Sequence, residues 1–285
     1  MRSQQTINCR GRILDLSEPL IMGILNLSPN SFFDGGLWKG ENFLFRVEQM
    51  LNEGADIIDI GGMSSKPGSD FISEEIELER IIKPLEAIVS NFPEAILSID
   101  TWRSKVVKES ADAGAHIIND ISAGSFDEEL FKTVADSGLP YILMHMKGTP
   151  KNMQQNPEYN DILPDVLDFF IKKIELLRVL NIKDIILDPG FGFGKTLEQN
   201  YKLLAGLKNF KMLGLPILAG ISRKSMICKV LNINSEFALN GTTAAHVLSL
   251  EQGASILRVH DVRAAFETIK IWQFYKKESP ITTFI

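Results

Sequence analysis

Short apolar runs alternate with longer amphipathic segments along the whole of this chain. The runs are rich in Ile, Val and Leu and lack a polar face, which is typical of parallel strands covered on both sides. We therefore predict strands at Ile21–Leu25, Ile57–Ile60, Ile96–Ile99, Ile117–Asn119, Tyr141–Met144, Ile185–Leu187, Ile217–Ala219 and Ile256–Val259. The segments between them have the spacing of amphipathic helices. We predict helices at Asn42–Asn52, Ser73–Ser90, Ser104–Ala113, Asp127–Ser137, Leu163–Leu180, Leu197–Asn209, Glu236–Gln252 and Val262–Tyr275.

A glycine follows several of these helices and precedes the next strand by a few residues, at Gly54, Gly114, Gly138 and Gly253. Glycine commonly ends helices because it adopts left-handed backbone without steric cost. The stretches Glu-Gly-Ala-Asp-Ile-Ile, Ala-Gly-Ala-His-Ile-Ile and Gln-Gly-Ala-Ser-Ile-Leu therefore repeat one arrangement of helix end, turn and strand start.

Strand-then-helix units repeated in this way predict an α/β protein with the (β/α)8 TIM-barrel fold. A doubly wound open sheet is the alternative, because periodicity does not show whether a sheet closes. Thr6–Cys9 and Arg12–Leu14 flank Gly11, so we predict that residues 1–16 form an N-terminal β-hairpin that closes the barrel. No linker or low-complexity stretch interrupts the pattern, which predicts a single domain over residues 1–285.

Composition narrows the functional classes. The chain has 285 residues, 45% hydrophobic and 23% charged, with a net charge of −6, so it lacks the overall basic charge that favours nucleic-acid binding. Cys9 and Cys228 are far apart and form no metal-binding spacing. The N-terminus is polar and no apolar run reaches about 18 residues. We expect a cytoplasmic protein that binds neither nucleic acid nor membrane.

The most unusual stretch is Ile185–Lys195, Ile-Ile-Leu-Asp-Pro-Gly-Phe-Gly-Phe-Gly-Lys. Its apolar residues stop at Asp188, and Pro189 cannot continue a strand ladder. The following loop is both glycine-rich and apolar, with Phe191 and Phe193 between the glycines. Such a loop suits the floor of a site for a flat ligand, although a plain turn with a capping aspartate has the same pattern.

Polar groups follow nearly every predicted strand. In TIM barrels the C-terminal strand ends carry the active site, so these groups are expected to meet. They are Asn26, the segment Gly61–Gly68, Asp100, Asn119, Met144-His145, Asp188, Ser222-Arg223-Lys224 and Arg258-Val259-His260.

These groups divide into two sets by chemistry. Asp100, Asn119 and Asp188 can accept hydrogen bonds from an edge rich in N–H, such as that of a 2-amino-4-oxo heterocycle, and Lys224 can hold a ring carbonyl or nitrogen. The second set is Lys66, Arg258 and His260, which suit phosphate oxygens. Asn26 lies near them and offers a hard oxygen, which suits a magnesium ion held mainly by ligand phosphates and water.

The sequence gives less support to histidine catalysis, a zinc site, a serine nucleophile or a P-loop. We interpret His116 and His145 as structural or solvated residues and His246, inside a helical pattern, as a packing residue. No His, Cys and Asp cluster has zinc spacing, and neither a G-x-S-x-G nor a P-loop motif is present. A helix start is the simpler interpretation of Ser222-Arg223-Lys224, but basic residues there oppose the helix dipole.

These motifs resemble those of the dihydropteroate synthase family over roughly Leu14 to Tyr275. Met22–Gly36 is similar to the family's first signature and Ile57–Gly68 to its second. The remaining matches follow in the family's order, at Ser98–Thr101, His116–Ile121, Leu143–Met146, Leu187–Lys195, Gly220–Met226 and Arg258–Asp261.

The resemblance implies a (β/α)8 barrel that condenses 6-hydroxymethyl-7,8-dihydropterin diphosphate with 4-aminobenzoate in folate biosynthesis, with Mg²⁺ as cofactor and a homodimeric assembly. It implies a pterin site formed by Asp100, Asn119, Ile121, Met144, Asp188, Phe193, Gly220 and Lys224. It implies a diphosphate site formed by Asn26, which also binds the metal, Lys66, Arg258 and His260. It implies an aminobenzoate site formed by Phe32, Ser65, Pro67, Phe193, Lys224 and Ser225. Asp100, Lys224, Arg258 and His260 would be the catalytic residues.

The chain departs from the family pattern in two loops. Met63, Ser65 and Lys66 stand where the family usually has Glu, Thr and Arg. Lys66 keeps the charge but loses the bidentate fork of arginine. Asn30 replaces the usual Asp, and Phe33 replaces a small polar residue. These differences lie on the aminobenzoate and diphosphate side, so they leave the reaction class unchanged and give no prediction of sulfonamide sensitivity.

Two other functions are compatible with parts of the sequence. A methyltetrahydrofolate:corrinoid methyltransferase uses a similar pterin-binding barrel, but it expels no diphosphate and has little need of the two basic sets. A catalytically silent pterin-binding or scaffold protein is supported only by the changes at Met63 and Lys66.

Overall fold

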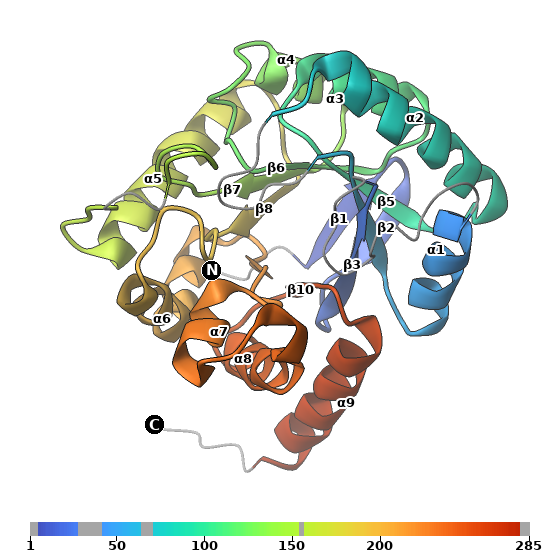
Figure 1. Ribbon diagram of the computed structural model, residues 1–285. Coiled ribbons are helices and arrows are strands. Elements are labelled where there is room, and N and C mark those ends of the chain that lie inside the picture. The colour runs from blue at the N-terminus through green and yellow to red at the C-terminus, as the bar shows by residue number, and fades with distance from the viewer. Residues whose placement is uncertain (1–4, 28–41, 64–70, 154–156, 280–285) are drawn as a thin grey trace.

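The computed structural model describes residues 5–27, 42–63, 71–153 and 157–279. Strands and helices alternate over these residues, with the helices outside and the strands inside (Figure 1). The strands are β1 (Thr6–Cys9), β2 (Arg12–Asp15), β3 (Leu20–Asn26), β4 (Ile57–Gly61), β5 (Ile96–Asp100), β6 (Ile117–Asp120), β7 (Tyr141–Met144), β8 (Ile185–Asp188), β9 (Leu218–Ala219) and β10 (Ile256–Val259).

The large sheet has eight parallel strands in the order β8-β7-β6-β5-β4-β3-β10-β9. A parallel bridge between Leu187 and Ile217 joins β8 to the residue before β9 and so brings the two edges of the sheet together. The predicted TIM-barrel class is therefore confirmed, and the open doubly wound sheet is excluded.

The helices are α1 (Asn42–Asn52), α2 (Glu74–Asn91), α3 (Ser104–Asp112), α4 (Leu130–Ser137), α5 (Ile162–Val179), α6 (Leu197–Ala205), α7 (Ser225–Leu231), α8 (Leu239–Glu251) and α9 (Val262–Glu278), with 3-10 helices η1 (Leu207–Leu213) and η2 (Ser235–Phe237). None of the described helices combines the length and the apolar character needed to cross a membrane.

The structure corrects some predicted helix boundaries. The helix predicted from Asp127 begins at Leu130. Asp127 lies outside it and contacts α3, where its carboxylate accepts the backbone N–H of Ser104 over 2.7 Å. The helix predicted to reach Asn209 ends before Gly206 and continues as η1. Helix α7 is absent from the helices predicted by periodicity, since seven residues are too few for a clear helical period, although a helix start was the simpler interpretation of Ser222-Arg223-Lys224.

The N-terminal hairpin packs under one end of the barrel. In β1 and β2 Thr6 is paired with Asp15, as the sequence predicts for a tight hairpin around Gly11. Its buried side chains Ile7, Cys9, Leu14 and Leu16 form one cluster with a layer of barrel residues, Met22, Ile57, Ile117, Ile142, Ile186, Leu218 and Ile256. This apolar layer closes the N-terminal end of the barrel.

The alternation of side chains along each strand also places the polar residues. Successive side chains of a strand point to opposite faces, so the residue two positions after each residue of the apolar layer also faces the barrel interior. These residues are Ile24, Asp59, Asn119, Met144, Asp188, Gly220 and Arg258. Asn26, Asp100 and His260 lie one step further along the inward faces of β3, β5 and the chain after β10. The predicted polar strand ends thus form layers above an apolar base.

Candidate functional site

Arg258 connects three strands at the centre of the site. Its Nε donates to Asp59 Oδ2 over 2.6 Å, and its Nη2 donates to Asp100 Oδ2 over 2.8 Å. The three groups lie on β10, β4 and β5. Burial alone would lower the pKa of Arg258, but Asp59 and Asp100 raise it above its usual value, so its charge is permanent.

Asp100 has an unusually high pKa for a carboxyl group. Burial raises its pKa to about 7, Arg258 opposes this shift, and the carboxylates of Asp59, Glu77 and Asp120 add to it. A carboxyl group with a pKa near 7 exchanges its proton at neutral pH, which is typical of functional sites.

Asp59 is a site residue that the sequence analysis missed. It is fully buried, and its Oδ2 also accepts from Asn119 Nδ2 over 3.0 Å. The available signal was a single carboxylate inside the otherwise apolar strand Ile57–Ile60, in a sheet whose strands are covered on both faces. Its partner Arg258 lies 199 residues away in the chain, so only the closed barrel reveals the contact.

Asp188 and Lys224 face each other across a glycine. A Cβ built on Gly220 would lie 3.8 Å from both Asp188 Oδ2 and Lys224 Nζ, so a larger residue would enter the space between them. The other oxygen of Asp188 accepts the backbone N–H of Gly190 over 2.7 Å. Burial raises the pKa of Asp188, although Lys224 and the Gly190 bond oppose it.

Lys224 is held by the loop that follows β8. Its Nζ donates to the carbonyl of Phe191 over 2.5 Å and lies 4.6 Å from the centre of the Phe193 ring. Burial lowers the pKa of Lys224 to about 8, while Asp188 raises it. Asp188, Phe193, Gly220 and Lys224, which the resemblance places at the pterin, therefore come together.

Lys195 was also missed as a site residue. Its side chain is 2% exposed, and its Nζ donates to the carbonyls of His145, Gly190 and Phe193 over 3.2, 2.9 and 3.0 Å. Burial lowers the pKa of Lys195 well below its usual value. These bonds of Nζ tie the loop after β8 to the end of β7 and so fix the loop that carries Phe193.

An apolar platform lies beside these polar groups. Met63, Trp102, Ile121, Met144, Met153 and Phe193 form one buried cluster. Ile121, Met144 and Phe193 are the apolar residues predicted to contact the ring, and the structure brings all three together. Met63, where the family has Glu, joins the same cluster. Flat aromatic ligands bind between such apolar walls and a few oriented polar groups.

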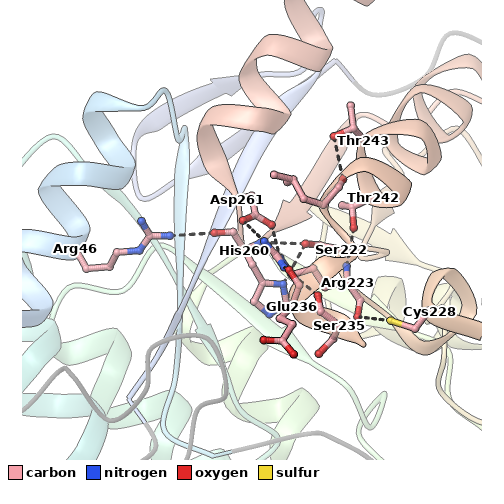
Figure 2. A network of polar contacts seen from close by, with 11 residues as sticks. Arg46, Ser222, Arg223, Cys228, Ser235, Glu236, Thr242, Thr243, His260 and Asp261 are labelled. Carbon is pink, nitrogen blue, oxygen red and sulfur yellow. Dashed lines mark hydrogen bonds and ion pairs between the residues drawn. The ribbon is translucent and has the colours of Figure 1, made fainter. Parts of the chain in front are cut away.

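A polar network fixes the loops after β9 and β10 (Figure 2). His260 donates its backbone N–H to Ser222 Oγ over 3.2 Å, and its Nδ1 lies 3.1 Å from the same oxygen. Arg223 pairs with both oxygens of Asp261 over 2.6 and 2.8 Å and donates to the carbonyls of Ser235 and Glu236.

The network also explains the basic run Ser222-Arg223-Lys224. Lys224 is the residue before α7, so a helix does begin here, as the simpler interpretation required. Asp261 compensates the charge of Arg223 beside that helix end. Ser225, the first residue of α7, is exposed next to Lys224, where the resemblance places aminobenzoate.

Asn26 lies beside the same site. A Cβ on Gly61 would be 3.5 Å from Asn26 Oδ1 and 3.6 Å from Asp100 Cβ, so these two side chains flank Gly61. Among the described residues, no group of three His, Cys, Asp or Glu side chains could hold a metal. One amide oxygen fits a magnesium ion whose remaining ligands are phosphates and water.

The remaining predicted residues are accounted for as follows. Phe32, Ser65, Lys66 and Pro67 lie outside the described residues. The three other histidines are buried: His116 accepts the backbone N–H of Leu97 over 3.2 Å, His145 packs its ring against Phe169, and His246 lies inside α8. Burial lowers the pKa of His116 and of His246 to about 4, so both are neutral at pH 7, consistent with structural roles.

Similarity to known proteins covers nearly the whole chain. Residues 22–260 match the family model described as "Pterin binding enzyme". The dihydropteroate synthase of Escherichia coli (strain K12) is 45% identical over 265 residues, which cover 92% of this chain and 93% of that protein.

Two solved structures extend this similarity to the fold. Dihydropteroate synthase of Yersinia pestis with a sulfonamide drug complex has a TM-score of 0.92 at 43% identity, covering 95% of this chain and 99% of that one. Dihydropteroate synthase of Xanthomonas albilineans with 4-aminobenzoic acid has a TM-score of 0.89 at 37% identity, covering 98% and 100%.

Proposed function

The chain belongs to the pterin binding enzyme family, as one of its dihydropteroate synthases, and from this premise we propose that the layered site above Met22 and Ile57 is where it makes dihydropteroate. It is a transferase that condenses 6-hydroxymethyl-7,8-dihydropterin diphosphate with 4-aminobenzoate to give 7,8-dihydropteroate and diphosphate. The observation that carries the proposal is the convergence of acceptors and cations from separate strands beside an apolar platform.

The pterin ring would lie against Ile121, Met144 and Phe193. Asp188 and Asn119 would accept hydrogen bonds from its amino-bearing edge, since a carboxylate matches two parallel N–H donors. Lys224 would donate to the ring carbonyl or a ring nitrogen across the space left by Gly220. Asp188 and Lys224 meet beside Gly220, and the three apolar residues belong to one buried cluster, which supports the assignment.

The diphosphate would bind on the side of Asn26 and His260, with Lys66 from outside the described residues. Arg258 would reach it through Nη1, because Nε and Nη2 are committed to Asp59 and Asp100. Asn26 would hold a magnesium ion together with the diphosphate oxygens. Bound there, the ion would supply positive charge to the leaving group.

Aminobenzoate would bind beside Phe193, Lys224 and Ser225, with Phe32, Ser65 and Pro67 from the loops outside the described residues. Its amine is neutral at pH 7 and needs no base before attack, which is consistent with the lack of a nucleophile–base pair among the site residues that the structure describes. The difficult step is then the break of the C–O bond between the pterin methylene and the diphosphate.

The protein's part in that step would be electrostatic. Arg258, His260 and Lys66 would stabilise the negative charge that grows on the departing diphosphate. The carboxylate of Asp100 would stabilise positive charge on the methylene carbon. The amine then forms the C–N bond and releases its proton. Formation of dihydropteroate from the two substrates, assayed with and without Mg²⁺, tests the function; no product under either condition would refute it.

The ring assignment predicts the effect of Asp188→Asn. The variant keeps the acceptor for Gly190 but loses the charge facing the ring, so pterin affinity should fall by about 1.5–3 kcal/mol, or roughly 10- to 150-fold. Isothermal titration calorimetry with the pterin measures this. Asp168→Asn, the same change at an exposed position of α5, is the control and should leave the affinity unaltered. An Asp188→Asn variant that binds as tightly as the control would contradict the assignment.

Pterin affinity should also depend on pH. Asp100 is the stronger acceptor when ionised, and because its pKa is raised to about 7 this form is lost as pH falls below 7. Lys224 is the stronger donor when charged, and because its pKa is lowered to about 8 this form is lost as pH rises above 8. Affinity should therefore peak between these values and decline by up to about tenfold per pH unit outside them.

The probe for this measurement is 6-hydroxymethyl-7,8-dihydropterin without its diphosphate, because phosphate groups titrate near pH 6 themselves. Calorimetry from pH 5.5 to 9.5 would follow the curve. A constant affinity across that range would show that neither group changes its charge in binding.

We also propose that the whole chain acts as one pterin-binding domain in a cytoplasmic homodimer. The dimer is supported by exposed apolar side chains on neighbouring elements α7, η2 and α8: Val230, Leu231, Phe237 and Leu248 are each about half exposed or more. Such patches often mark contacts between subunits. Sedimentation velocity tests the assembly.

A further inference from the structure

The burial of Asp59 is not explained by a gain in folding stability. Asp59 lies in the middle of β4, in register with Ile24 on β3 and Ser98 on β5, and is 0% exposed. One oxygen, Oδ2, accepts two hydrogen bonds, while Oδ1 is buried without a hydrogen-bond partner among the described residues. A buried carboxylate with an unsatisfied oxygen is costly, so such groups are usually kept for a function.

Asp59 fixes which end of the Asn119 amide faces the site. An amide side chain has a donor nitrogen and an acceptor oxygen at opposite arms. Nδ2 is directed to Asp59 Oδ2 at 3.0 Å, which leaves Oδ1 as the arm that can face a ligand. With its amide held this way, Asn119 accepts from a ligand and does not donate to it.

Asp59 fixes Arg258 as well. Its 2.6 Å bond to Nε and the 2.8 Å bond from Nη2 to Asp100 hold the planar guanidinium at two points on different strands. A guanidinium held at two edges has one orientation, and it presents only donors. One carboxylate thus controls an acceptor and a donor of the same site.

We propose that Asp59 is a positioning residue that selects the hydrogen-bonding pattern of the ring. By holding Asn119 as an acceptor at the position of the 2-amino group, it favours an amino-bearing 2-amino-4-oxo edge over a 2,4-dioxo edge, and the same carboxylate holds Arg258 for the diphosphate. The inference rests on the proposed function of the site, since it concerns the same pterin. Without Asp59, the Asn119 amide can rotate and donate to a carbonyl at the position of the amino group.

The experiment compares two ligands by calorimetry, 6-hydroxymethyl-7,8-dihydropterin and its 2,4-dioxo analogue. Asp59→Asn keeps an oxygen for both bonds but loses the charge, so the pterin should bind about three- to tenfold more weakly. Asp59→Leu removes both bonds and leaves Arg258 paired with Asp100, so the pterin should bind at least about thirtyfold more weakly. The preference for the amino-bearing ring should shrink in Asp59→Leu and be largely retained in Asp59→Asn.

Two further readouts separate positioning from general damage. The KM for 4-aminobenzoate at saturating pterin diphosphate should stay within about twofold in Asp59→Asn, because that substrate contacts neither bond. Asp56→Asn, the same change at the residue before β4 and so at the opposite end of the strand from the site, is the matched control.

The outcomes distinguish this inference from the function itself. If the unmodified chain does not bind the pterin, the proposed function fails. If it binds and Asp59→Asn binds equally tightly, or the foldable Asp59 variants weaken both substrates alike with an unchanged ring preference, the positioning role is refuted. Should Asp59→Leu fail to fold, the pterin affinity and aminobenzoate KM of Asp59→Asn still decide the question.

Discussion

Arg258→Ala is expected to reduce turnover by about 10²–10³-fold, the usual loss when one donor to a developing charge is removed. The same change should destabilise the fold. It leaves Asp59 and Asp100 close together in the interior without the cation that now bonds to both. Breaking such a pair costs about 3–5 kcal/mol, which lowers the melting temperature of a chain of this size by roughly 6–20 °C.

The destabilisation should depend on pH. Without Arg258 the folded-state pKa of Asp100, which burial already raises, rises further above the unfolded value, so the native state binds more protons than the unfolded chain. Stability then falls as pH rises through the folded pKa. Thermal unfolding of Arg258→Ala should show a larger deficit at pH 8 than at pH 6.

Two variants control this experiment. Arg263→Ala removes an exposed arginine whose ion pair with Glu267 lies on the surface of α9, and it should change neither turnover nor stability appreciably. Adding Asp59→Asn to Arg258→Ala should recover stability but not turnover, because it removes one buried charge without replacing the donor. Near-normal turnover in Arg258→Ala would refute its role.

Gly190→Ala is expected to cause a comparable loss of stability through a different mechanism. Gly190 has a φ of 69°, and a Cβ there would lie 2.0 Å from the carbonyl oxygen of His145. Left-handed backbone costs a side-chain-bearing residue about 1–2 kcal/mol and overpacking about 1–3 kcal/mol, so the expected destabilisation is roughly 2–5 kcal/mol. The neighbour is backbone that Lys195 holds in place, so it cannot move aside cheaply.

Gly138→Ala provides a matched control for this prediction. Gly138 has nearly the same φ, 66°, but nothing lies within 4 Å of its Cβ position. Only the backbone cost of about 1–2 kcal/mol should appear there. Gly190→Ala should also weaken pterin binding, because the N–H of Gly190 bonds to Asp188, whereas Gly138→Ala should not. Equal melting temperatures for the two variants would show that the close approach to His145 does not lower the free energy of unfolding.

Much of the fold follows from sequence because the barrel repeats one local rule. Each strand is apolar on both faces, so its limits stand out; the predicted Tyr141–Met144 and Ile256–Val259 match β7 and β10. Helix α7 and the late start of α4 were not predictable in this way. Helix α7 has seven residues, too few for a clear period, and neither α7 nor α4 has a side-chain cap that would mark its start.

The site residues also differ in whether the sequence alone can identify them. Asp188 and Arg258 stand at strand ends, where the barrel rule assigns function, so the sequence could identify them. Asp59 and Lys195 act through partners that become neighbours only when the chain folds: Asp59 through Arg258 and Asn119, and Lys195 through three backbone carbonyls. Backbone acceptors have no side-chain signature, so a buried lysine of this kind cannot be recognised from the residue types around it.

The central claim is that polar groups from separate strands receive one pterin ring and its diphosphate in a fixed orientation. A crystal structure of the chain with 6-hydroxymethyl-7,8-dihydropterin diphosphate tests it most directly. We expect the amino-bearing edge within hydrogen-bond distance of Asp188 and Asn119 Oδ1, with the diphosphate beside Asn26 and His260. A ring bound away from these strand ends, or turned so that its diphosphate points to Asp188, would contradict the account.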